Sequence, residues 1–187
     1  MERGDATPLE CTTRLAVERD LNLLCNLLQD CIDDMRAHGI DQWDDVYPSR
    51  ATLLADIQSG TAYVATLFDA QLVGFLVLNE YQNPEYAHVA WSINGVPTAV
   101  VHRLMVHPAH QQQGLARFLM RFAEARATAL GYRAIRLDAF TANPRALRLY
   151  QGLGYRDAGG VTFRKGPFRC FEKALAPQAE RADGGRG

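Results

Sequence analysis

Several features that would place this chain in a particular class are missing from it. No Gly-x-x-x-x-Gly-Lys-Ser/Thr motif occurs, so the lysine and hydroxyl that hold a metal-bound triphosphate are lacking. Gly-x-Gly-x-x-Gly is also absent, which argues against a dinucleotide-binding fold. No apolar run approaches the ~20 residues of a membrane-spanning helix, and the polar residues 1–8 contain no apolar core of a secretory signal. We therefore expect a cytoplasmic protein.

Cysteine is scarce, and its spacing does not suit a metal. The chain has four cysteines, none of which forms a Cys-x-x-Cys pair, and no histidine lies at zinc-finger spacing from them. We predict buried or half-buried thiols in a reducing compartment and no structural metal. The four are Cys11, Cys25, Cys31 and Cys170.

Length and charge point to one ordinary globular domain. The chain has 187 residues and a formal net charge of −1. Such a charge suits neither a nucleic-acid scaffold nor a polybasic membrane anchor, so neither partner is expected. We predict a single domain over residues 11–176, a flexible lead over 1–10 and a disordered Gly-, Arg- and Ala-rich tail over 177–187.

Apolar periodicity and turn residues predict the element order β-α-α-β-β-β-α-β-α-β-β. Asp20, Ser49 and Asn143 are the expected helix N-caps, the last followed by Pro144. Residues 69–71 are expected to form the turn of a β-hairpin. We expect strands at 11–17, 61–68, 72–80, 98–106, 134–140, 155–163 and 169–174. We expect helices at 20–39, 49–60 and 115–131, and a last helix that begins at 143 and ends near 152 or 154.

This order predicts an α/β fold with a mixed, mainly antiparallel sheet of six to seven strands and about four flanking helices. A parallel β-α-β crossover is expected between residues 98 and 140. Within the strand at 134–140, Arg136 and Asp138 share one face and the alternating apolar residues share the other.

The most informative segment is a strand that ends at Pro108 and is followed by Gln-x-x-Gly-x-Ala over 111–116. The first turn of a helix carries unpaired N–H groups and a partial positive charge, so it can hold a phosphate. Gly114 and Ala116 lack bulk, and Arg117 and Arg121 add charge one turn apart. Taken alone, this motif is equally consistent with an ordinary helix start.

A second motif makes the pattern more specific. The run Leu104–Pro108 with Gln111–Arg117 resembles the acetyl-CoA-binding motif of the GNAT family of N-acetyltransferases. Asn143–Tyr155 resembles the family's second signature, Asn-x-x-Ala-x-x-Leu-Tyr-x-x-x-Gly-Phe/Tyr, and Phe171–Leu175 is similar to its last strand. The resemblance spans roughly residues 12–175. It implies a GNAT-like sheet, acetyl-CoA as co-substrate and no metal.

The resemblance also implies where acetyl-CoA binds. Backbone groups of the strand would pair with the pantetheine amides, and the turn at Gly114 would cradle the diphosphate. Asn143 would contact the pantetheine arm or set the second helix. The expected cofactor-binding residues are Leu104, Met105, Val106, Gln111, Gln112, Gln113, Gly114, Leu115, Ala116, Arg117 and Asn143.

Tyr150 and Asp138 are the expected catalytic residues. Tyr150 lies seven residues after Asn143, on the same helix face, and a phenol there could protonate the departing thiolate. Asp138 matches a position that serves as a base in some relatives, with His102 or a chain of waters as alternatives. Each also has a structural interpretation: a core tyrosine for Tyr150, a solvated strand carboxylate or an ion-pair partner of Arg136 for Asp138, and a sheet-face histidine for His102.

The acceptor site is expected near the first helix pair. The resemblance points to Gln42, Trp43 and Tyr47, with His102, and Tyr81 and Trp91 are further candidates. These aromatic residues are equally consistent with a lid over the core.

The expected function is transfer of an acetyl group from acetyl-CoA to a primary amine, by direct attack within a ternary complex. The acceptor would be a small molecule, a peptide or a protein. Dimers are common in the family, so a homodimer is one expected assembly, although no residue decides it. The alternative from another class is a non-catalytic acyl-CoA-binding sensor or interaction module.

Overall fold

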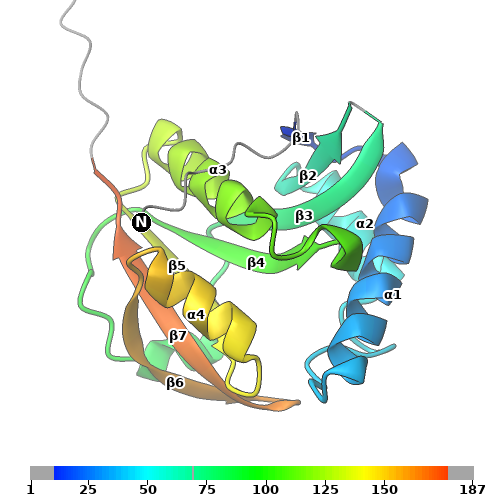
Figure 1. Ribbon diagram of the computed structural model, residues 1–187. Helices are drawn as coiled ribbons and strands as arrows, with labels where there is room; N and C mark the ends of the chain where they lie inside the picture. Colours follow the sequence, from blue (N-terminus) through cyan, green and yellow to red (C-terminus); the bar gives the residue numbers. More distant parts are fainter. Residues whose placement is uncertain (1–10, 69, 177–187) are drawn as a thin grey trace, which may run out of the picture.

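The computed structural model describes residues 11–68 and 70–176, so the expected lead and tail lie outside the described residues. The described strands form one seven-stranded sheet in the order β1-β2-β3-β4-β5-β7-β6 (Figure 1). The strands are β1 Cys11–Leu15, β2 Ala62–Leu67, β3 Gln71–Asn79, β4 Thr98–Val106, β5 Ala134–Phe140, β6 Arg156–Phe163 and β7 Gly166–Ala174, and the helices are α1 Leu21–Ala37, α2 Arg50–Gln58, α3 Leu115–Ala129 and α4 Pro144–Gly152.

The predicted element order and mainly antiparallel sheet are confirmed. β2 and β3 form the expected antiparallel hairpin, although Asp69 in its turn lies outside the described residues. Three short 3₁₀ turns were not predicted: η1 Glu18–Asp20, η2 Pro84–His88 and η3 Pro108–His110. No helix in the part of the chain that the structure describes is long and apolar enough to cross a membrane.

Two of the three predicted caps act as expected. Ser49 accepts a hydrogen bond from the main-chain N–H of Thr52 (3.2 Å), and Asn143 accepts one from that of Ala146 (3.1 Å). Asp20 precedes α1, but the expectation that its side chain caps this helix is wrong. Its carboxylate instead accepts from the guanidinium of Arg14, because η1 turns it back toward β1.

Helices cover both faces of the sheet (Figure 1). One cluster packs α1 and α2 against Val64, Phe75 and Met105. The other packs α3 and α4 against the opposite face, which includes Ala65 and Ile135. Because both faces are covered, strand residues are buried on both sides, as in β2, which is buried throughout its length and apolar except for Thr66.

β4 and β5 are paired over a short stretch only. The parallel pairing joins Thr98–Val100 to Ala134–Arg136. Beyond it, β4 contains a bulge, because the β3–β4 register shifts between Phe75 and Val77, and Arg103 has a φ of 51°. The later part of β4 is therefore not paired with β5, and space opens between the two strands.

A buried carboxylate fastens the segment between β3 and β4 to β7. The side chain of Glu172 is fully buried and accepts hydrogen bonds from the N–H (2.8 Å) and hydroxyl (2.6 Å) of Ser92. It also accepts from the N–H of Ile93 (3.2 Å) and from Arg156 (2.7 Å). Burial alone would raise the pKa of Glu172, but these hydrogen bonds outweigh it and lower the pKa from 4.5 to about 2.

Glu172→Gln should lower the free energy of unfolding by about 2 kcal/mol near neutral pH, since charge-assisted hydrogen bonds are lost. A depressed carboxyl pKa stabilises the fold above its unfolded value of 4.5, and this contribution is lost as pH falls toward about 2. The difference between wild type and variant in chemical denaturation should therefore shrink over that range. The exposed Glu18→Gln is the control, and equal effects of the two substitutions at neutral pH would contradict the assigned role.

Candidate active site

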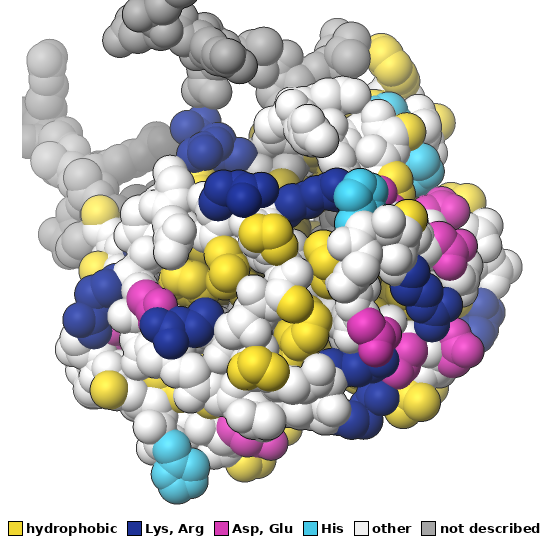
Figure 2. Space-filling model, turned by 60° about the horizontal axis from the view of Figure 1, so that its bottom comes forward, with side chains coloured by type: hydrophobic (Ala, Val, Ile, Leu, Met, Phe, Trp, Pro, Cys, Tyr) yellow, Lys and Arg dark blue, Asp and Glu magenta, His cyan; other side chains and the backbone are white. Residues whose placement is uncertain are grey.

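A cavity of about 920 Å³ lies where β4 and β5 part. α1 and the loop after it, the start of α3, α4 and the β6–β7 turn complete its walls. On the face shown in Figure 2, apolar side chains line a hollow bordered by Lys and Arg side chains. The predicted site residues that line the cavity are Gln42, Trp43, Tyr47, His102, Leu104, Met105, Val106, Gln111, Gln112, Gly114, Leu115, Ala116, Arg117, Asp138, Asn143 and Tyr150.

Four residues that the sequence suggested for the site do not line this cavity: Gln113, Tyr81, Trp91 and Arg121. The side chain of Gln113 turns back to donate to the carbonyl of Ala109 (3.2 Å). Tyr81 is 61% exposed and lies beside the ring of His102. Trp91 packs under the guanidinium of Arg136, away from the cavity.

The turn before α3 has the backbone geometry of an anion cradle. Gln112 and Gly114 both have left-handed conformations, with φ values of 61° and 85°. Such alternation turns successive N–H groups toward a common point. Gly114 is the N-cap and contributes no side-chain cap, so the first N–H groups of α3 are available to a ligand. A Cβ placed on Gly114 would meet no atom within 4 Å, which leaves room for an anion.

Arginines of both helices add positive charge to the cavity wall near this turn: Arg117 from α3, and Arg145 and Arg148 from α4. Arg117 donates to the carbonyl of Gly152 (3.3 Å), which fixes the approach of α3 to α4. Positive charge on both helices suits a ligand with phosphate groups.

Gln111 braces the two sides of the cavity. Its amide nitrogen lies 3.3 Å from the carboxylate of Asp34 on α1, and its amide oxygen accepts from Arg145 on α4 (3.0 Å). Arg145 also reaches Asp34 directly (3.2 Å). The carbonyl of Val106 accepts from Gln111 (3.4 Å) and from the thiol of Cys31 (3.5 Å). Two side chains thus already hydrogen-bond to the Val106 carbonyl, which lies at the end of the strand edge expected to pair with the pantetheine amides.

Tyr150 has the buried ring of a core tyrosine and a hydroxyl placed as a catalytic acid would require. Its ring is buried and packs against Tyr155 and Phe171, with centroids 6.0 and 5.8 Å away. Its hydroxyl makes no hydrogen bond to the described residues. A fully buried hydroxyl without a partner occurs among those residues at Tyr155 but not at Tyr150. The Tyr150 hydroxyl is therefore accessible, and it opens to the cavity that this residue lines. Burial raises the pKa of Tyr150, which keeps the phenol protonated.

Asp138 lines the cavity from β5, and the interpretation of it as an ion-pair partner of Arg136 is wrong. Its Oδ2 accepts from the hydroxyl of Tyr86 (2.7 Å). Arg136 instead donates to Gln82 (2.7 Å) and to the carbonyl of Ile93 (2.6 Å). Burial raises the pKa of Asp138, as expected for a carboxylate taken out of water.

His102 is held as a neutral imidazole. Its Nε2 lies 3.1 Å from Asn79 Oδ1 and 3.1 Å from the carbonyl oxygen of Tyr81. A carbonyl only accepts, so we assign the ring proton to Nε2 and the lone pair to Nδ1. Burial, with the nearby Arg103, lowers the pKa of His102 to about 4. This histidine is therefore a weak base at neutral pH.

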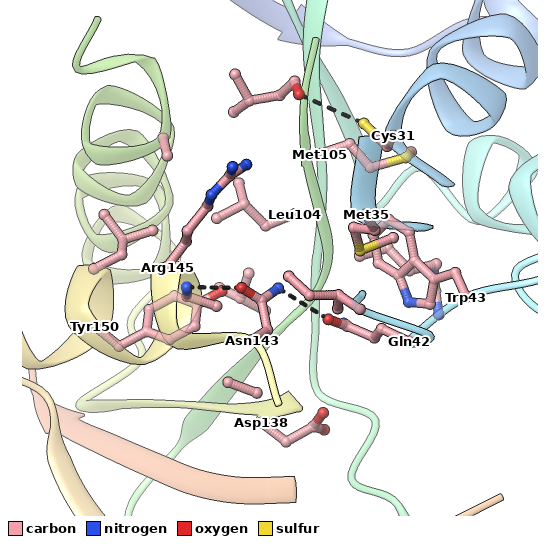
Figure 3. Close-up of a pocket in the computed structure, with 18 of the residues that line it drawn as sticks. Cys31, Met35, Gln42, Trp43, Leu104, Met105, Asp138, Asn143, Arg145 and Tyr150 are labelled. Atoms are coloured by element: carbon pink, nitrogen blue, oxygen red, sulfur yellow. Dashed lines mark hydrogen bonds between the residues drawn. The ribbon is translucent and has the colours of Figure 1, made fainter. Parts of the chain in front are cut away.

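The loop between α1 and α2 closes one end of the cavity. Gln42 accepts from Asn143 at the start of α4 (3.1 Å), and Figure 3 shows this bond joining the two segments. Tyr47 accepts from Arg103 (2.6 Å). Trp43 lines the cavity and also packs in the core with α1 and α2. Its position is therefore consistent both with a cavity wall and with a lid over the core.

The β6–β7 turn meets this loop through ion pairs. Arg164 binds both carboxylate oxygens of Asp44 (2.7 and 2.9 Å). Lys165 reaches Asp41 and Asp44 at 2.8 Å. Both basic residues line the cavity, so this turn forms part of its wall.

Several of these residues were not predicted from the sequence. Arg145 and Arg148 lie three residues apart inside the second motif, and that helical spacing was a usable signal. Tyr86 and Lys165 lie in segments with no motif, so no local pattern pointed to them. Within residues 11–68 and 70–176, no group of three or more His, Cys, Asp or Glu side chains could hold a metal ion. The four cysteines are free thiols, buried or half-buried as predicted.

Comparisons with known proteins give the same family as the motifs. The model of the acetyltransferase (GNAT) family matches residues 27–155. A GNAT-family acetyltransferase from Streptococcus agalactiae is 20% identical, with a TM-score of 0.79 over 91% of this chain and 98% of its own. A comparison with curated proteins finds no match.

Two similar structures were solved with a ligand. The yncA protein from Salmonella typhimurium, solved with its cofactor acetyl-CoA, is 18% identical (TM-score 0.66, 91% of this chain and 96% of its own). The PaiA N-acetyltransferase from Thermoplasma acidophilum, in complex with coenzyme A, is 20% identical (TM-score 0.69, 89% and 99%). These similar structures show that the chain has the same fold as they do. The matched residues 27–155 include both motifs and most of the cavity walls, and the chain therefore belongs to the acetyltransferase (GNAT) family.

Proposed function

We propose that this protein is an N-acetyltransferase that moves the acetyl group of acetyl-CoA to a primary amine by direct attack, with both substrates bound together. One observation carries the proposal. A single cavity contains the left-handed turn before α3, the unpaired edge of β4 and the open hydroxyl of Tyr150. Acetyl-CoA is the cofactor of the similar Salmonella protein.

The residues present suit acetyl-CoA along its length. The N–H groups at Gly114, with Arg117, Arg145 and Arg148, match a diphosphate. The edge of β4 before Val106 is not paired with β5, so it can form main-chain hydrogen bonds with the amides of an extended arm. Tyr150 then lies along the same cavity, where the thioester would be.

Bound acetyl-CoA would supply an acetyl group activated as a thioester. The amine nitrogen forms a bond to the acetyl carbon, and the carbon–sulfur bond breaks. A main-chain N–H of β4 near Leu104 or Met105 would stabilise the charge that develops on the carbonyl oxygen. Tyr150 would donate its proton to the departing sulfur, and Asp138 would accept the proton that the amine loses.

The pKa directions support this assignment. Burial raises the pKa of Asp138 toward the working pH, which suits a base, whereas the pKa of His102 falls to about 4. A protonated Tyr150 can act as a donor.

Direct attack is favoured over a covalent acetyl-enzyme on Cys31. This cysteine lines the cavity, but burial raises its pKa to about 12, and its thiol points at the carbonyl of Val106. The thiolate is the reactive form, so Cys31 would remain protonated and unreactive at neutral pH.

The activity is tested with acetyl-CoA and a panel of small amines and of peptides that carry a free N-terminus or a lysine. We expect coenzyme A thiol release, followed with a thiol reagent, to exceed the blank without acceptor for at least one amine. Mass spectrometry should show one acetyl group on that amine. Binding of acetyl-CoA by calorimetry without turnover on any acceptor would instead support the sensor alternative.

Gly114→Glu should weaken acetyl-CoA binding by roughly 100-fold or more, since it places bulk and negative charge where the diphosphate is expected. Gly131→Glu is a matched control: Gly131 lies just after the other end of α3, also has a left-handed φ (91°) and has open space around a Cβ. Both substitutions place a side chain at a similar left-handed φ, and only the first should lose affinity in calorimetry. Similar losses in both would place the diphosphate elsewhere.

Tyr150→Phe should lower kcat by about 100-fold, because the proton donor is lost while the ring still fills its site. The Kd for acetyl-CoA should change little. Tyr155→Phe serves as the control, since its ring packs against Tyr150 but does not line the cavity. Unchanged kcat in Tyr150→Phe would remove this residue from the acid role.

A further inference from the structure

Tyr86 stands out among the buried polar residues outside both motifs. It lies in η2, is only 2% exposed, and gives its hydroxyl proton to Asp138 Oδ2 at 2.7 Å. It does not line the cavity, so it would reach the reaction only through Asp138.

The hydrogen bond fixes which oxygen of Asp138 faces the cavity. Oδ2 is taken by Tyr86. Oδ1 makes no hydrogen bond within the described residues and is not among their buried polar atoms without partners, so it is open to the cavity that Asp138 lines. The carboxylate torsion of aspartate is otherwise broad, so a single strong hydrogen bond selects its orientation.

Tyr86 is itself held firmly. Its ring packs against that of Trp91, with centroids 5.2 Å apart, and Trp91 Nε1 donates to the Tyr86 carbonyl (3.0 Å). The guanidinium of Arg136 lies over Trp91 at 4.2 Å and is anchored by Gln82 (2.7 Å). The segment between β3 and β4 therefore presents the hydroxyl from a fixed position.

Several groups around Asp138 influence its pKa. Burial is the largest influence and raises the pKa. The Tyr86 hydrogen bond and the charge of Arg103 lower it, whereas the charge of Glu85 raises it. Tyr150 on α4 and Cys170 on β7 also face this carboxylate. Of these groups, only Tyr86 forms a hydrogen bond with it.

We propose that Tyr86 is a positioning residue for acetyl transfer, which holds the Asp138 carboxylate with Oδ1 turned to the incoming amine and stabilises its ionised form. The inference rests on the proposed function, because it needs Asp138 to accept the proton of the amine.

The test compares wild type with Tyr86→Phe, which keeps the ring and removes the hydroxyl. kcat/KM for an amine found in the panel should fall by about tenfold at neutral pH. The rise of kcat/KM with pH should move to higher pH, since the ionised carboxylate has lost a donor. The Kd for acetyl-CoA should not change. Tyr132→Phe is the matched control: its hydroxyl also donates to a carboxylate, that of Glu80 (2.6 Å), but away from the cavity.

A double-mutant cycle with Asp138→Asn separates positioning from a loss of folding. If Tyr86 acts through Asp138, Tyr86→Phe should have no further effect on kcat in the Asp138→Asn background. A general destabilisation would lower the rate in both backgrounds and would overturn the proposal. Carboxyl-carbon NMR gives an independent readout: the titration midpoint of Asp138 should rise in Tyr86→Phe and stay unchanged in Tyr132→Phe.

The outcomes separate this inference from the proposed function. Wild-type protein without turnover would remove the function, and this role with it. Wild-type turnover with an unchanged rate and pH profile in Tyr86→Phe, or an unchanged NMR midpoint, would remove the role of Tyr86 alone.

Discussion

The separation of β4 from β5 is the constraint on which the site depends. Two parallel strands normally continue their pairing, and a buried main chain without partners is costly. Here pairing ends after Val100, and a left-handed Arg103 turns β4 away. The cavity lies in that gap, so the edge of β4 is available to a ligand.

The bulge is held by a buried ion pair. Arg103 binds both carboxylate oxygens of Asp56 on α2 (2.6 and 2.8 Å), and both side chains are 11% exposed. Burial raises the pKa of Asp56, while the charge of Arg103 lowers it. Such a pair contributes little net stability, but removing one partner leaves a buried charge. Its value here is geometric, because it ties a strained strand residue to a rigid helix.

Around this gap, the fold gives similar groups different tasks. Tyr150 and Tyr86 are both buried tyrosines. The hydroxyl of Tyr150 opens to the cavity, whereas that of Tyr86 donates a hydrogen bond to Asp138. Asp138 and His102 both line the cavity, and burial shifts their pKa values in opposite directions. Desolvation always disfavours the charged form, so it favours a proton on the carboxylate and its loss from the imidazole. The proposed donor and acceptor follow from these environments.

The sequence by itself determined what short-range patterns encode. Strand and helix order, the caps at Ser49 and Asn143, and the helix start at Gly114 each depend on residues a few positions apart. Both family motifs are local in the same way. They predicted a set of cofactor-binding residues, and all of these except Gln113 line one cavity. The cap at Asp20 failed because its carboxylate found Arg14 on β1.

Only the tertiary structure decided which distant groups meet. Tyr86 and Asp138, Arg103 and Asp56, and the Gln42–Asn143 pair are each separated by tens of residues or more in the chain. No periodicity links such positions, since their approach depends on how the strands part and how the loops fold over them. The structure also decided that the Tyr150 ring belongs to the core while its hydroxyl opens to the cavity, because the packing of α4 against the sheet sets that depth.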